Sequence, residues 1–173
     1  VLEDAVDGYT TSIPTSLGTT TNGYVGTITN THEIEKTSVT VNKEWIDGNN
    51  QDGIRPDSVN ITLDATITNT NGEKENVTIP GTVTRTITLN EGNKWAYTWS
   101  GLDKNKAGQK IEYTVVENNV KTGYSVSVVP NNQTAENGYD YTVTNSHTPE
   151  TTSVTVNKEW NDDSNRDGKR PSS

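Results

Sequence analysis

The amino-acid sequence predicts an all-β protein, an antiparallel β-sandwich that recurs in tandem about every 115 residues. Only 28% of the residues are hydrophobic, and these are mostly Val, Ile, Tyr and Trp that alternate with polar residues, as in half-exposed strands. Turn dipeptides such as Asn-Gly and Asp-Gly separate the alternating runs, and no stretch has a helical period. Nine residues also recur without any difference, at 37–45 and at 152–160.

Seven alternating runs in the middle of the chain are expected to be strands. They lie near 37–46, 58–68, 82–90, 94–99, 110–117, 123–129 and 139–146. The first run ends at two Asp-Gly pairs and the second before Asn71-Gly72, while Glu91-Gly92 separates the third from the fourth and Asn137-Gly138 precedes the last. Seven short strands in about 110 residues favour a sandwich of two sheets.

The identical stretch belongs to a longer repeat. The offset of 115 between Lys43 and Lys158 also relates Asn30 to Asn145. We therefore expect three segments, which are residues 1–35 as the C-terminal part of a preceding repeat, residues 36–148 as one complete repeat, and residues 149–173 as the N-terminal part of a following repeat. The joins between them are short, which favours a stiff row of domains over a flexible tether.

The composition excludes several classes of protein. The formal net charge is −9 and no basic cluster interrupts it, so binding to nucleic acid or to an anionic membrane surface is disfavoured. No apolar run is long enough to span a membrane. The chain has no cysteine, so its stability must come from something other than disulfides. It also has no methionine, which suggests a piece excised from a longer protein, and we expect no cofactor.

Three polar residues fall on otherwise apolar faces of the expected strands. Alternation places Lys43 on one face with two valines and a tryptophan, Glu117 on a face with a tyrosine and a valine, and Asn145 on a face with two tyrosines and a valine. An unpaired buried group of any of these kinds is costly. The most economical arrangement is that the three side chains meet inside the sandwich.

Such a meeting would permit a reaction. Desolvation lowers the pKa of a buried lysine, so Lys43 can act as a neutral nucleophile. Attack on the side-chain carbonyl of Asn145, with Glu117 polarising that carbonyl and relaying protons to departing ammonia, would give an intramolecular isopeptide bond. The plainer alternative is that Lys43 reaches water or forms an ion pair with Glu117. Periodicity alone favours this alternative.

Several motifs together resemble the Cna B-type domain, which forms the stalks of Gram-positive surface adhesins and pilins. They are the run Val-Thr-Val-Asn-Lys-Glu-Trp, Arg55-Pro56 with the strand that follows, the Trp95 strand with Gly101-Leu102, the run from Ile111 to Glu117, Gly123-Tyr124, and the closing run from Tyr141 to Asn145. The resemblance covers the complete repeat and both flanks. It implies an inverse immunoglobulin-like sandwich.

The resemblance also implies a self-generated bond between a lysine and an asparagine, assisted by an acid. By position, these residues are Lys43, Asn145 and Glu117. The flanks match the remaining parts of other such sets: Glu3 is the acid, Asn30 the asparagine and Lys158 the lysine. Because one chain cannot easily complete this second set by itself, we expect neighbouring segments, or identical chains joined head to tail, to complete one another.

The expected function is structural. The repeat would be a covalently locked stalk or fibre module of an extracellular, cell-wall-anchored surface protein or pilus, with adjacent repeats as its partners and one autocatalytic turnover in place of enzymatic activity. The alternative is a module that binds carbohydrate or host matrix, with Trp95, Tyr97 and Trp99 as an exposed aromatic platform. Such a stripe more often belongs to the core.

Two further features receive plain interpretations. Residues 163–168 fit the opening of a calcium loop, but the corresponding loop of the complete repeat lacks the first aspartate, so a polar loop without metal is expected. His32 and His147 each follow a candidate asparagine by two residues and have no partner at a metal-ligand spacing, so both are interpreted as linker residues.

Overall fold

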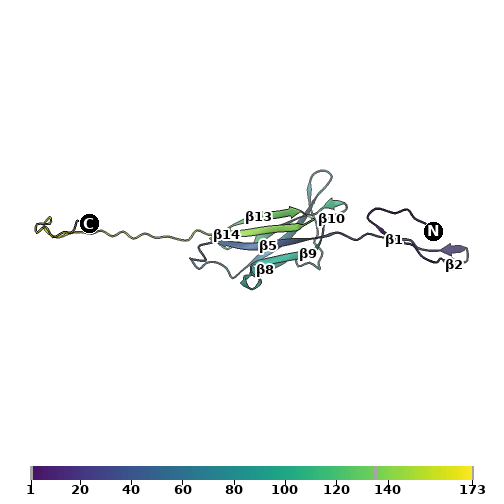
Figure 1. Cartoon of the computed structure of the whole chain (residues 1–173), viewed down its shortest axis with the longest axis horizontal. Helices are drawn as coiled ribbons and strands as arrows, with labels where there is room; N and C mark the ends of the chain where they lie inside the picture. The colour runs from purple at the N-terminus through teal and green to yellow at the C-terminus, as the bar shows by residue number, and fades with distance from the viewer. Residues whose placement is uncertain (1, 135, 173) are drawn as a thin grey trace.

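A computed structural model describes residues 2–134 and 136–172 of the chain. Residue 1, which opens the first expected segment, lies outside the described residues. Within the described residues, every regular element is a strand except one 3₁₀ turn, Glu91–Asn93. Figure 1 shows a central sandwich with a thinner segment leaving it at each end, so that the two termini lie far apart. The predicted all-β class is confirmed.

The first sheet contains both the first and the last strand of the central unit. Its order is β13-β14-β5-β9. These strands are β5 (Lys36–Ile46), β9 (Ala96–Asp103), β13 (Ser125–Thr134) and β14 (Gly138–Ser146). The pairs β13–β14 and β5–β9 are antiparallel, as predicted, whereas β14 runs parallel to β5 along eight residue pairs. A parallel pair is allowed here because the chain crosses through the second sheet between these two strands.

The second sheet is built around one long strand, β6. Its strands are β6 (Ser58–Thr68), β7 (Lys74–Asn76), β8 (Thr86–Asn90) and β12 (Glu112–Asn118). β12 pairs with one edge of β6, while β8 and β7 share the other edge, and all three pairings are antiparallel. A small hairpin of β10 (Asn105–Lys106) and β11 (Gln109–Lys110) joins this sheet to the first.

The two sheets enclose one core, and the alternation in sequence determines which residues enter it. In β6 the buried residues are every second one, namely Val59, Ile61, Leu63, Ala65 and Ile67. The buried hydrophobic residues of the described chain all lie between Val39 and Val143. The central unit therefore has a complete hydrophobic core without help from either flank.

The N-terminal flank repeats the hairpin that ends the central unit. β1 (Thr10–Ser12) pairs with β4 (Thr29–Thr31), and β2 (Gly18–Thr20) pairs with β3 (Gly23–Val25). In β1–β4, Thr10 pairs with Thr31. In β13–β14, the residues 115 positions later, Ser125 and Ser146, pair in the same way. The two hairpins therefore share this register at the offset of 115 residues.

The C-terminal flank shows that the first strand of a repeat needs its neighbours. The sequence that forms β5 at 37–45 has no strand at 152–160, where Val154 and Val156 are 86% and 85% exposed. β5 lies between β14 and β9, and the described part of the flank supplies neither. Tertiary pairing, and not local propensity, therefore makes this strand.

The expected strands all appear, with differences at their ends. The third expected strand, β8, is shorter than predicted because it begins at Thr86. Strand β7 and the β10–β11 hairpin were not predicted. The fourth begins at Ala96 because Lys94 and Trp95 leave the 3₁₀ turn with φ values of 55° and 57°, and it continues to Asp103. Such positive φ values interrupt the extended backbone that a strand requires.

Candidate functional site

Lys43 lies on the inward face of β5, as the alternation predicts. Its side chain is 0% exposed, and its Nζ donates a 2.7 Å hydrogen bond to the carbonyl of Glu44. The same Nζ lies 3.9 Å from the centroid of the Trp45 ring. Burial lowers the pKa of Lys43 from 10.5 to about 8, although the nearby carboxylate of Glu117 opposes this shift. The neutral amine is therefore within reach near neutral pH.

Glu117 and Asn145 meet between the two sheets. The side-chain amide Nδ2 of Asn145 donates a 2.7 Å hydrogen bond to Oε1 of Glu117, and Asn145 is completely buried. The other carboxylate oxygen, Glu117 Oε2, lies 4.0 Å from Nζ of Lys43. The structure thus brings the expected lysine, acid and amide into one buried cluster.

The strand register explains how these three side chains converge. In the parallel pair of β5 and β14, Lys43 lies opposite Val143, and Asn145 lies opposite Trp45. Glu117 comes from β12 in the facing sheet and points between them. A slip of one residue in β5 would turn Lys43 to the outer face.

Three polar atoms of this cluster are buried without any hydrogen-bond partner. They are Oε2 of Glu117, Oδ1 of Asn145 and the indole Nε1 of Trp45. Leaving a buried donor or acceptor unpaired costs about 1–3 kcal/mol each. Unpaired groups of this kind require an explanation, and a reactive role is one of the recognised explanations. The carbonyl oxygen of Asn145 and the carboxylate beside it are the groups that amide chemistry would use.

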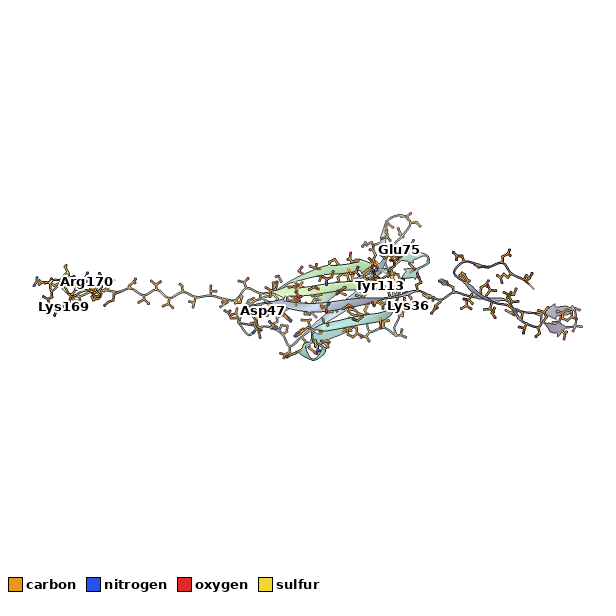
Figure 2. All side chains as sticks on the ribbon, in the orientation of Figure 1. Lys36, Asp47, Glu75, Tyr113, Lys169 and Arg170 are labelled. Carbon is orange, nitrogen blue, oxygen red and sulfur yellow. The ribbon has the colours of Figure 1, made fainter. Side chains whose placement is uncertain are left out.

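A second buried network lies beside the cluster. The carboxylate of Asp47, 2% exposed, accepts hydrogen bonds from Nε of Arg55 at 2.8 Å and from the hydroxyl of Tyr124 at 2.8 Å. The Arg55 guanidinium holds the pKa of Asp47 well below its usual range. Arg55 also lies 5.3 Å from the Trp45 ring that contacts Lys43. Figure 2 shows Asp47 at the end of the sandwich from which the C-terminal segment leaves.

Sequence reasoning missed this network, although the repeat contains its signal. Asp162 and Arg170 stand 115 residues after Asp47 and Arg55, and Arg170 Nε donates a 2.9 Å hydrogen bond to Asp162. Because this copy forms the same contact without a sandwich around it, the loop geometry is largely local. A charged pair that recurs at the repeat spacing was the available clue.

The flanking candidates are placed in two separate groups. Nδ2 of Asn30 donates a 2.8 Å hydrogen bond to Oε1 of Glu3, the same contact that Asn145 makes with Glu117. Lys158 is in the C-terminal segment, where its Nζ lies 4.3 Å from the Trp160 ring. Figure 1 shows the two flanks at opposite ends of the molecule, so the structure does not bring Lys158 to Asn30 within one chain.

The aromatic residues proposed as a binding platform do not form one. Trp99 is 1% exposed, and its Nε1 donates a hydrogen bond to the carbonyl of Thr84. Trp95 is half-buried and packs edge-on against Trp45, and Tyr97 is 38% exposed. These residues therefore serve mainly the core.

The described residues were expected to hold no metal ion and no membrane span. Among residues 2–134 and 136–172, no group of three or more His, Asp or Glu side chains is arranged to hold a metal ion. In the loop that resembles a calcium site, Asp163 pairs with Arg166. The described residues contain no helix with the length and apolar character needed to cross a membrane.

Comparisons with known proteins show what this chain is similar to. Residues 39–146 match the family of the Cna protein B-type domain. The collagen adhesin of Staphylococcus aureus is 40% identical over 99% of this chain, which spans 12% of that protein's length. The crystal structure of two B repeat units of the S. aureus collagen-binding protein has a TM-score of 0.63 and 40% identity, covering 97% of this chain and 38% of that one. A single B repeat unit of the same protein has a TM-score of 0.50 and 37% identity, covering 84% of this chain and 63% of that one.

Proposed function

Because this chain belongs to the Cna protein B-type domain family, we propose that residues 36–148 are a stalk module of a bacterial surface protein, locked by an isopeptide bond between Lys43 and Asn145. The likeness to repeat units of a collagen-binding surface protein supports the extracellular, cell-wall-anchored location. The module is structural: it reacts once, with itself, and then resists pulling.

The proposed reaction is an amide exchange. The neutral amine nitrogen of Lys43 attacks the side-chain carbonyl carbon of Asn145, and a new C–N bond forms as the original carboxamide C–N bond breaks. Glu117 takes the proton that the amine loses and passes it to the departing nitrogen, which leaves as ammonia. The products are one amide and one ammonia, and no oxidant or cofactor is needed.

The bond would stabilise the module by closing a long loop. Lys43 is near the start of the unit and Asn145 near its end, so nearly the whole module becomes covalently cyclic. On the loop-entropy account used for disulfides, closing a loop of this length contributes about 4–5 kcal/mol. An amide also survives reducing conditions, which suits a chain without cysteine.

One observation carries this proposal: the buried contact of Asn145 with Glu117, with Lys43 4.0 Å from the same carboxylate. The experiment is proteolysis of the folded chain followed by mass spectrometry of the peptides. A branched peptide that joins Lys43 to Asn145 is expected. Recovery of both residues only in separate, unmodified peptides would refute the bond.

The flanks are proposed to complete one another. One flank holds Asn30 against Glu3, and the other holds Lys158 over Trp160, each arranged as in the central unit. Bringing the two together supplies the lysine, asparagine and acid of a second set. We propose that this happens between successive segments of a longer array, or between identical chains joined head to tail.

A further inference from the structure

The linker after the central unit is attached to the unit it leaves. His147 follows β14, and both of its ring nitrogens face acceptors: Nδ1 lies 2.9 Å from the carbonyl of Gly123, and Nε2 lies 2.8 Å from Oδ2 of Asp52. Both nitrogens can donate only in the charged imidazolium. The Asp52 carboxylate accordingly raises the pKa of His147. His147 is thus more than the linker residue that the sequence suggested.

The loop that contains Asp52 also contacts the linker two and three residues after His147. Oδ2 of Asp52 accepts a 3.0 Å hydrogen bond from the backbone N–H of Glu150. Pro149 packs so closely on Gly48 that a Cβ at this glycine would lie 3.0 Å from the proline ring. The loop between β5 and β6 therefore contacts the linker at His147, Pro149 and Glu150.

The linker before the central unit is attached to the unit it enters. The carbonyl of Glu35 accepts a 3.0 Å hydrogen bond from the backbone N–H of Lys104, and the Glu35 carboxylate lies 3.7 Å from Nζ of Lys104. Lys36, the next residue, pairs with Asp103 across β5 and β9. Figure 2 shows Lys36 at the end of the sandwich opposite Asp47. The chain is thus held as it enters one end and as it leaves the other.

Glu35 and Glu150 occupy the same position in successive repeats, because they stand 115 residues apart. One copy shows the contact with the repeat that follows, and the other shows the contact with the repeat that precedes. We propose that each such glutamate makes both contacts at once. Glu150 would donate its N–H to Asp52 of the preceding repeat, while its carbonyl and carboxylate bind the lysine that corresponds to Lys104 in the repeat that Glu150 enters.

This shared residue would make the junction an interface between repeats instead of a hinge. The N–H and the C=O of one residue are fixed to two different domains, so no free linker residue remains between them. Backbone torsions at one residue then set the angle between successive sandwiches. The Glu35–Lys104 ion pair is long, at 3.7 Å, and the Glu35 side chain is 60% exposed, so the pair contributes little on its own. The two hydrogen bonds that involve backbone groups carry the orientation.

The test uses the chain extended after Ser173 by residues 59–148, which completes a second repeat and keeps the natural junction. The central unit has its own core, so the added unit is expected to fold. Spin labels are attached at Cys in place of exposed Ser127 in each repeat, since the chain has no other cysteine. Pulsed electron spin resonance then measures the distribution of distances between the two repeats.

The distribution of distances between the two spin labels is expected to be narrow. A reference protein with two glycines inserted after Glu150 should give a broad distribution, and Asp52→Ala should broaden the distribution toward this reference. Asp57→Ala, an exposed aspartate of the same loop region, is the matched control and should leave it narrow. The amide of Lys104 in the second repeat should also exchange slowly with solvent. A parent distribution as broad as the glycine reference, no effect of Asp52→Ala, or fast exchange at Lys104 would each overturn the shared junction.

The shared junction does not depend on the crosslink. The intact mass of each sample counts the isopeptide bonds, while the distance distribution reports the junction. A protein without the bond can still have a narrow distribution, and a fully crosslinked protein can have a broad one. The two proposals therefore fail separately.

Discussion

Asn145 donates its side-chain amide to Glu117 at 2.7 Å, from one sheet of the sandwich to the other. The contact places a carboxylate against the amide that would lose ammonia and 4.0 Å from the amine of Lys43. The same contact between Asn30 and Glu3 recurs in the N-terminal flank. An acid next to an asparagine is therefore a repeated property of this chain.

Glu117→Gln should prevent or strongly slow the crosslink while the fold is retained. The substitution keeps the size and hydrogen-bonding shape of the side chain but removes the group that relays the proton. The intact mass should then lack the loss of ammonia. Glu112→Gln, at an exposed position of the same strand β12, is the control and should crosslink normally. Normal crosslinking of Glu117→Gln would exclude the proposed role of the acid.

The stability of the uncrosslinked protein should depend on the titration of Lys43. In Asn145→Ala the lysine remains free, with a pKa of about 8 when folded and 10.5 when exposed. Between these values the unfolded chain binds more protons, so the unfolding free energy should rise with pH, by up to about 3 kcal/mol. Urea denaturation at pH 7 and at pH 10 measures this difference. Lys43→Met in the same background should remove it, and an equal pH response in both proteins would contradict the assignment.

Asp47→Asn should destabilise the central unit, by about 3 kcal/mol, because it leaves Arg55 without its buried partner. The pKa of Asp47 is lowered in the folded state, so its contribution is present above the unfolded pKa near 3.9 and is lost as pH falls below that value. Thermal unfolding between pH 3 and pH 7 should show a weaker acid dependence in the variant. Asp162→Asn makes the same change in the flank and should leave the midpoint of the central unit unaltered.

Chains should join through their flanks if the second set forms between molecules. Denaturing gel electrophoresis of concentrated protein should then show a ladder of covalent multimers. Lys158→Ala and Asn30→Ala should each abolish the ladder, and mixing the two variants should restore dimers only, because one free lysine and one free asparagine remain in the mixture. A single band at 18.9 kDa for the parent chain would argue against joining between chains.

The sequence was sufficient to predict much of the fold. Alternation over two residues identified the long strands and placed Lys43, Glu117 and Asn145 on inward faces, because each sits among large apolar residues of the same face. Burial of alternate residues is a local property, so a local pattern reveals it. The internal offset of 115 is the basis for the predicted division into a complete repeat and two flanks.

Other features depend on pairing between remote segments, which no local pattern encodes. The parallel contact of β5 with β14, the buried pair of Asp47 and Arg55, and the attachment of His147 to Asp52 all join residues that only the folded chain brings together. Trp95 shows that a local pattern can also predict a strand residue wrongly. Its place in the alternation predicted a strand residue, but a left-handed backbone at the end of a 3₁₀ turn removed it from β9.

The central claim is that Lys43 and Asn145 become one amide, and accurate mass under denaturing conditions tests it most directly. The parent chain should be lighter than its sequence mass by one ammonia for each completed bond, and Lys43→Ala should show no such loss within the single chain. A parent mass equal to the sequence mass would contradict the account, because the buried lysine, asparagine and glutamic acid would then be an unreacted ion-pair network.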